Sequence, residues 1–177
     1  MELRKFIATT IREYLNEQQN IKTNLNDNFW KWFGNSVVKT SSGKPIVANH
    51  YSNSSDITYF KQKDDDGYIR THSLTNSGIY FNLGETIAKY GKHGYYVYLK
   101  FENPFRIKNY ISDVINPYTN KKIELEHIND LDKKYLTEKG YDSVMGSTMQ
   151  VVAFSAYQIK SIENDGTWDI TDNNIYS

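Results

Sequence analysis

The sequence contains no cysteine and only three prolines among its 177 residues. Without cysteine the chain can form neither a disulfide framework nor a thiolate metal site, and redox chemistry at a thiol is excluded. A long apolar run is also lacking at the N-terminus, where charged residues interrupt the stretch from Met1 to Gln19. A signal peptide or a membrane span needs such a run, so we expect a soluble protein without a membrane partner.

Net charge and metal motifs are missing as well. The 21 basic residues equal the 21 acidic ones, so the composition gives no support to a general nucleic-acid binder, which relies on excess positive charge. The four histidines lack the spacing of zinc ligands: His50, His72, His93 and His127. Asp64 to Gly67 lacks the alternating carboxylates of a calcium loop. We therefore expect no metal site.

The length predicts one domain of ordinary size with additions at its ends. A helix is expected from about Glu2 to Gln18, because apolar residues recur there at spacings of three and four. A polar linker follows this helix. We assign the N-terminal helix and linker to residues 1–27 and the folded domain to residues 28–177.

The rest of the chain predicts an α+β domain rich in strands. Short strands are expected at 37–38, 46–50, 79–81, 95–101, 141–145, 150–154 and 158–162, with Pro104 ending the fourth or following its end. Helices are expected at 29–33, at 85–90 and from about 129 to 140. Because helices and strands do not alternate regularly, packed antiparallel sheets are favoured over a doubly wound parallel sheet.

The signals at the helix ends are specific. Asp27 or Asn28 is expected to cap the first of these helices, and Gly34 to close it. The apolar rings of that helix are interpreted as a packing cluster rather than a ligand platform. Asn129 or Asp130 is expected to cap the last helix, which Gly140 ends.

Four short motifs follow one another in a characteristic order. They are Ala48-Asn49-His50-Tyr51-Ser52, Gly78-Ile79-Tyr80-Phe81, Ala88-Lys89-Tyr90, and Gln150 to Phe154 followed by Gln158-Ile159. This order resembles the ADP-ribosyltransferases, in particular the branch related to poly(ADP-ribose) polymerases and diphtheria toxin. In that branch a strand ends in His-Gly-Ser or His-Gly-Thr, a Gly-Ile-Tyr-Phe strand leads into a helix, and a late strand opens with Glu.

A closer resemblance is to the small transferase domains of polyvalent proteins from phages and mobile elements. It is carried by Trp-Phe-Gly-Asn-Ser at 32–36, the Gly-Lys-Pro turn at 43–45, and Phe154 with the closing Gln-Ile-Lys-Ser at 158–161. The resemblance covers about Asn28 to Trp168. It implies the ADP-ribosyltransferase fold, with two packed, mainly antiparallel sheets around an NAD cleft and flanking helices.

The resemblance also implies that NAD is the substrate and gives its binding residues. His50 would hydrogen-bond a ribose hydroxyl on the adenosine side, while the backbone of Tyr51 binds the nicotinamide amide and the hydroxyl of Ser52 assists nearby. Tyr80 and Tyr90 would sandwich the nicotinamide ring, and each stacking contact would contribute about 1 kcal/mol. Tyr51 stands where the family usually has Gly, so its side chain must point away from the pocket.

Gln150 completes the expected catalytic set with His50 and Tyr80. It occupies the position of the family's Glu, which binds the 2'-hydroxyl of the nicotinamide ribose and stabilises the cation that forms as nicotinamide leaves. An amide keeps the hydrogen bond but can neither carry negative charge nor act as a base. We expect slow turnover or an acceptor that needs no activation. Thr148 replaces the second acidic or amide residue of arginine-modifying relatives, so arginine specificity is not implied.

These residues predict a mono-ADP-ribosyltransferase that modifies a macromolecule, with protein favoured over nucleic acid as the acceptor. A phage or mobile element is the expected source. The expected location is the cytoplasm of a bacterial host, or a phage virion with other virion proteins as partners. Two alternatives stay open: an NAD glycohydrolase, and a degenerate domain that binds a nucleotide or a protein.

Overall fold

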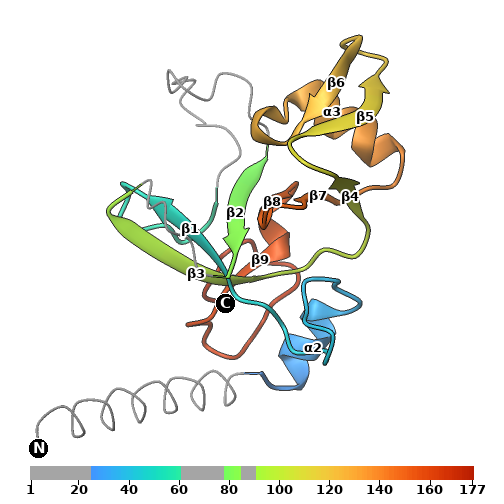
Figure 1. Cartoon of the computed structure of the whole chain (residues 1–177). Coiled ribbons are helices and arrows are strands. Elements are labelled where there is room, and N and C mark those ends of the chain that lie inside the picture. Colours follow the sequence, from blue (N-terminus) through green and yellow to red (C-terminus); the bar gives the residue numbers. More distant parts are fainter. Residues whose placement is uncertain (1–24, 61–77, 85–90) are drawn as a thin grey trace, which may run out of the picture.

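The computed structural model describes residues 25–60, 78–84 and 91–177 (Figure 1). Four sequence expectations lie outside these ranges: the helix at 2–18, the helix at 85–90 with Tyr90, the acidic turn at 64–67, and His72. No helix within the described ranges is long and apolar enough to span a membrane.

The described strands form two sheets, mainly antiparallel, as expected for an α+β domain. The larger sheet has the order β4-β7-β8-β2-β1-β3-β9. Its strands are β1 (Ala48–Ser52), β2 (Ile79–Leu83), β3 (His93–Leu99), β4 (Pro104–Ile107), β7 (Ser143–Gly146), β8 (Gln150–Ala153) and β9 (Ile159–Ser161). Only β4 and β7 pair in parallel among these neighbours. A small second sheet pairs β5 (Ile111–Asn116) with β6 (Lys121–Glu124).

The larger sheet has a narrow joint between β1 and β2. These strands pair at two positions, Ala48 with Leu83 and Asn49 with Asn82, whereas β1 pairs with β3 along its whole length to Ser52. Figure 1 shows β1 and β3 turning away from β2 beyond this joint. The sheet is thus divided into two halves, β4-β7-β8-β2 and β1-β3-β9. The two halves separate at His50.

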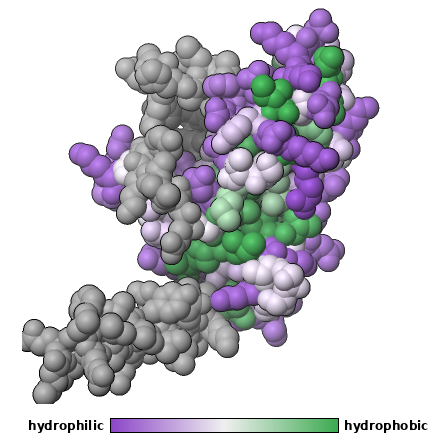
Figure 2. All heavy atoms as spheres, in the orientation of Figure 1, coloured by the Kyte–Doolittle hydropathy of each residue, from purple (hydrophilic) through white to green (hydrophobic). Residues whose placement is uncertain are grey.

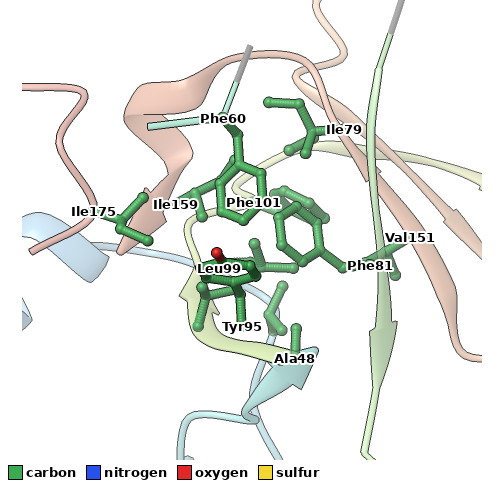
Figure 3. Close-up of a cluster of buried hydrophobic side chains, with 13 residues drawn as sticks. Ala48, Phe60, Ile79, Phe81, Tyr95, Leu99, Phe101, Val151, Ile159 and Ile175 are labelled. Atoms are coloured by element: carbon green, nitrogen blue, oxygen red, sulfur yellow. The ribbon is translucent and has the colours of Figure 1, made fainter. Parts of the chain in front are cut away.

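Three hydrophobic clusters hold the described residues together. The first lies on one face of the larger sheet and includes side chains from β1, β2, β3, β8 and β9, with Phe60 and Ile175 added from outside the strands (Figure 3). The second lies on the other face, between β2, β7, β8, the β5–β6 hairpin and α3. Side chains along β2 point alternately to the two faces of the sheet. Ile79 and Phe81 therefore enter the first cluster, whereas Tyr80 packs against the second. Each fully buried aliphatic or aromatic side chain contributes about 1.5–3 kcal/mol.

The third cluster confirms the packing role of the N-terminal aromatic residues except Trp30, which is 45% exposed. Helix α2 (Asp27–Phe33) buries Phe29, Trp32 and Phe33 against Tyr98 and Trp168. The expected cap was wrong by one residue: the side chain of Asn26 accepts a hydrogen bond from the amide of Phe29 at 3.0 Å. Asn26 takes this role because its backbone is extended while residue 27 is already helical. Gly34 closes the helix as expected, with a φ of 54°.

Helix α3 (Asp130–Glu138) confirms the prediction for residues 129–140. Asn129 caps the helix in a capping box with Asp132, whose carboxylate in turn accepts a hydrogen bond from the Asn129 amide. Gly140 follows with a φ of 83°, a conformation that glycine adopts without a steric penalty.

Several expected strands differ in the structure. β1 continues through Ser52 instead of ending at His50. Residues 37–38 form no strand, and only a single bridge, Lys39 to Pro45, marks the expected hairpin. Pro104 follows the end of β3 at Leu99, as expected, but it also opens β4, a strand that was not predicted. Proline is tolerated there because β4 is an edge strand, where a missing N–H breaks no ladder bond. The β5–β6 hairpin was not predicted.

A buried lysine anchors the C-terminal stretch. Lys160 in β9 is 0% exposed, and its ammonium donates hydrogen bonds to the carbonyls of Asp172 and Asn174 and to the hydroxyl of Ser177. Burial lowers the pKa of Lys160, and nearby aspartates including Asp172 oppose this.

The space-filling view shows hydrophilic residues over most of the lobe that holds β5, β6 and α3, with a hydrophobic band below it (Figure 2).

Candidate active site

The three residues singled out in the sequence lie on neighbouring strands. His50 lies in the middle of β1, Tyr80 is the second residue of β2, and Gln150 opens β8. Strands β1, β2 and β8 are consecutive in the larger sheet, with β2 in the middle, so residues distant in sequence are brought to one region of the sheet. The pairing with β8 places Gln150 opposite Asn82 and Val152 opposite Tyr80.

The three side chains do not all leave the sheet on the same face. Tyr80 and Gln150 share one face, because directly paired residues and residues two apart on a strand project together. His50 leaves β1 toward the other face, where its ring contacts Phe60 and Phe81 at centroid distances of 5.0 and 5.6 Å. The candidate site therefore lies where β1 parts from β2, with His50 on one face of the sheet and Tyr80 and Gln150 on the other.

The ring of His50 links β1 to β2 where the two strands part. Its Nδ1 lies 2.8 Å from the carbonyl oxygen of Tyr80. A carbonyl can only accept, so Nδ1 carries the proton and Nε2 is left as a hydrogen-bond acceptor when the ring is neutral. Burial lowers the pKa of His50 from its usual 6.5, and the hydrogen bond to Tyr80 opposes only part of this shift. At pH 7 the ring is neutral and Nε2 is free to accept a hydroxyl proton.

Tyr80 connects the site to the second hydrophobic cluster. Its hydroxyl oxygen accepts a hydrogen bond from the amide of Ile128 at 3.0 Å, and its ring packs against that cluster. Burial raises the pKa of Tyr80 well above its usual value, with smaller contributions from Asp132 and Glu126, while the Ile128 bond works in the opposite direction. The phenol stays protonated, so Tyr80 offers the site an aromatic ring and no negative charge.

The end of β1, beyond His50, pairs with β3 and no longer with β2. Tyr51 is paired with Gly94 of β3, and its ring lies over Gly94, where an added Cβ would come within 3.1 Å of the ring. The Tyr51 hydroxyl reaches the hydroxyl of Tyr96 at 3.3 Å. The ring therefore extends along β3, away from β2. Ser52 ends the strand, and its hydroxyl accepts a hydrogen bond from the amide of Ser54 at 3.1 Å.

Sequence reasoning missed two amide side chains beside Gln150. Asn49 pairs with Asn82, and Asn82 pairs with Gln150, so the three amides form one row across β1, β2 and β8 on the face of Tyr80. Asn49 is only 4% exposed. The available signal for Asn49 was its position between Ala48 and His50 in a strand expected to be buried. A buried amide needs a specific hydrogen-bond partner.

Gln158 of the closing motif has a structural role. Its carbonyl oxygen accepts from the amides of Phe154 and Ser155, and its amide nitrogen donates to the carbonyls of Lys100 and Asp142. One side chain thus joins the end of β8, the end of β3 and the segment before β7. This arrangement fixes the position of β8, which carries Gln150.

A cavity of about 350 Å³ lies elsewhere, beside the start of β3. It is lined by residues of four segments, among them Lys92, His93, Tyr96, Glu163 and Tyr176, and by none of the candidate catalytic residues. Within the described ranges, no group of three or more His, Cys, Asp or Glu side chains is placed to hold a metal ion.

Comparison with known protein families gives one match. The family model described as ADP-ribosyltransferase in polyvalent proteins matches residues 40–168. This range includes β1, β2 and β8 and spans more than half of the chain. Comparisons with the curated proteins and with the solved structures found no match.

Proposed function

Because the chain belongs to the family of ADP-ribosyltransferases in polyvalent proteins, we propose that it transfers a single ADP-ribose group from NAD to a macromolecular acceptor. The family supports ADP-ribosylation in general, and NAD is the ADP-ribose donor that this chemistry requires. The observation that carries the proposal is the pair of acceptors near the point where β1 parts from β2. These are Nε2 of His50 and Oε1 of Gln150.

A dinucleotide bound where β1 parts from β2 would use both acceptors. Its nicotinamide riboside half would meet Tyr80 and Gln150, which share one face of the sheet. Its adenosine half would pass beyond the edge of β1, where Nε2 of His50 accepts from a ribose hydroxyl. The backbone of Tyr51 lies between the two, with its side chain directed away along β3.

The residues of the site favour a dissociative reaction. The bond between ribose C1' and the nicotinamide nitrogen breaks, and nicotinamide leaves with the bonding electron pair. Oε1 of Gln150 holds the ribose 2'-hydroxyl and places electron density near the resulting cation. The acceptor then attacks C1' and loses its proton to solvent, because Gln150 has no basic group to receive it.

A protein is the proposed acceptor, in preference to nucleic acid, because the balanced charge of the chain provides no general attraction for phosphates. The polyvalent-protein family supports a phage or mobile-element source. The proposed place of action is the cytoplasm of a bacterial host. The protein would be made there or be delivered by a virion that carries it.

Incubation of the protein with NAD labelled in the adenosine half and a bacterial lysate tests this proposal. Label on a protease-sensitive, nuclease-resistant target, together with free nicotinamide, is the expected result. Release of nicotinamide and free ADP-ribose without a labelled target would identify a glycohydrolase instead. NAD binding by thermal shift without nicotinamide release would identify a binding domain.

Substitutions of Tyr80 separate its ring from its hydroxyl. Tyr80→Phe removes the acceptor of the buried Ile128 amide, so the free energy of unfolding should fall by about 1–3 kcal/mol while NAD affinity stays within a few fold. Tyr80→Ala also removes the stacking surface and should weaken NAD binding by roughly fivefold or more. Urea denaturation and isothermal titration measure the two effects. Equal losses of NAD affinity in both variants would rule out stacking.

The binding of NAD should depend on pH through His50. Its pKa in the folded protein lies below 6.5, so the ring is neutral above that pH and Nε2 is available. Acidification through the lowered pKa protonates Nε2, and affinity should then fall by up to about tenfold per pH unit. Titration of NAD between pH 8 and pH 5 tests this dependence. His50→Gln keeps a neutral side chain, and an unchanged pH profile in that variant would exclude His50 as the cause.

A further inference from the structure

Two buried side-chain atoms stand out among the described residues because they have no hydrogen-bond partner. They are Oδ1 of Asn49 and Oε1 of Gln150. Buried polar atoms in folded proteins are nearly always paired, so each such exception needs an explanation. The two atoms belong to the same row of amides, at positions that flank Asn82 on the intervening strand. A single ligand that brings hydrogen-bond donors to this row would satisfy both.

The other half of the Asn49 amide is already engaged. Its nitrogen donates a hydrogen bond to the carbonyl of Gly84, the residue that follows β2. Rotation of the amide by half a turn would place Oδ1 against that carbonyl, and two acceptors repel each other. The Gly84 bond therefore fixes the orientation of Asn49 and keeps Oδ1 as the acceptor that awaits a donor.

We propose that Oδ1 of Asn49 accepts a hydrogen bond from the carboxamide N–H of the nicotinamide in NAD, and that this bond makes Asn49 a specificity-determining residue. The proposal rests on the proposed function, because it takes NAD as the ligand of this face. It concerns substrate selection and does not assign Asn49 to the bond-breaking step.

The spacing of the row favours the carboxamide over the ribose hydroxyls. Adjacent strands lie about 4.8 Å apart, so the backbones of Asn49 and Gln150 are separated by roughly 10 Å across β2. Gln150 occupies the place of the ribose contact. The carboxamide projects from the nicotinamide ring away from the bond to ribose, so an acceptor two strands from Gln150 faces the carboxamide. The ring of Tyr80 lies on the same face, as a stacking partner requires.

The test compares NAD with its 3-acetylpyridine analogue, in which a methyl group replaces the carboxamide NH₂. Release of the base from both substrates is measured as kcat/KM for wild type, Asn49→Ala and Asn49→Asp at pH 8. Wild type should prefer NAD, and Asn49→Ala should lose roughly tenfold or more of that preference. Asn49→Asp should keep most of it, because a carboxylate still accepts from the N–H. Using the ratio of the two substrates cancels any general loss of activity.

Asn49→Asp is also the control for a purely structural role, since both variants lose the bond to Gly84. The proposal is overturned if Asn49→Ala prefers NAD over the analogue as strongly as wild type does. It is also overturned if Asn49→Ala and Asn49→Asp lose this preference to the same extent. If Asn49→Ala does not fold, Asn49→Leu takes its place in the same comparison, because leucine has about the size of asparagine and no acceptor. Absence of any NAD binding or cleavage by wild type would instead refute the proposed function itself.

Discussion

Replacing Gln150 by alanine is expected to slow nicotinamide release by roughly 30- to 1000-fold while NAD affinity changes little. The physical reason is the loss of one preorganised polar contact to the ribose that strengthens as positive charge develops, an effect of about 2–4 kcal/mol on the barrier. Single-turnover measurement of nicotinamide release, with NAD in excess over its dissociation constant, isolates this step. An unchanged rate in an active protein would place the catalytic strand elsewhere.

The same substitution should leave the fold intact. Oε1 of Gln150 has no partner in the free protein, so its removal breaks no hydrogen bond of that atom and removes a buried unpaired acceptor. The melting temperature of Gln150→Ala should therefore equal or exceed that of wild type in the absence of NAD. A large loss of stability would show that Gln150 supports the fold, and the kinetic result could not then be assigned to chemistry.

Gln150→Glu tests the role of charge at the same position. A carboxylate stabilises the ribose cation better than an amide does, so cleavage should be faster than in wild type. In the free protein the partly buried carboxylate would lack a donor, which should lower the melting temperature, and NAD should restore part of the loss. Inactive wild type with an active Gln150→Glu variant would identify a domain that keeps the pocket and has lost the chemistry.

Substitution of Gln158 should have the largest effect on stability. Gln158→Leu removes four hydrogen bonds and leaves two backbone amides and two carbonyls to find new partners in partly buried surroundings. We expect the free energy of unfolding to fall by about 3 kcal/mol or more. Denaturant unfolding followed by tryptophan fluorescence measures this change, because Trp32 and Trp168 are buried in the third cluster.

Tyr157→Ala provides the matched control for Gln158. Tyr157 is the preceding residue, and its side chain is 47% exposed, so its removal should change the free energy of unfolding by no more than about 0.5 kcal/mol. A similar loss in both variants would indicate that the turn tolerates no change at all. A small loss in Gln158→Leu would show that the four backbone groups find water in place of the side chain.

The sequence predicted the parts of the fold whose signals are local. Helix α3 was predicted from a cap at Asn129 or Asp130 and a terminal glycine, signals that lie within one short segment. Helix α2 was also found, although its cap lies at Asn26, because several neighbouring polar residues can serve as a cap. The strands that carry His50, Tyr80 and Gln150 were located because each begins or continues a β-branched or aromatic run.

The sequence did not predict β4 or the β5–β6 hairpin that follows it. Residues 104–124 contain Pro104 and many polar or exposed side chains, and the hairpin buries only part of each strand. A strand of this kind is stabilised by its neighbours more than by its own composition. Its amino-acid pattern therefore resembles that of a loop until the partner strand is known.

The motif order by itself determined the family and the candidate residues, because residue identity and sequence order are all that such a resemblance requires. Only the tertiary structure decided how these residues face one another. The faces of His50, Tyr80 and Gln150 depend on strand register and on the parting of β1 from β2, and both are set by contacts between distant segments. The unpaired acceptor of Asn49 was likewise found only in the structure, because whether a polar atom has a partner depends on every element packed around it.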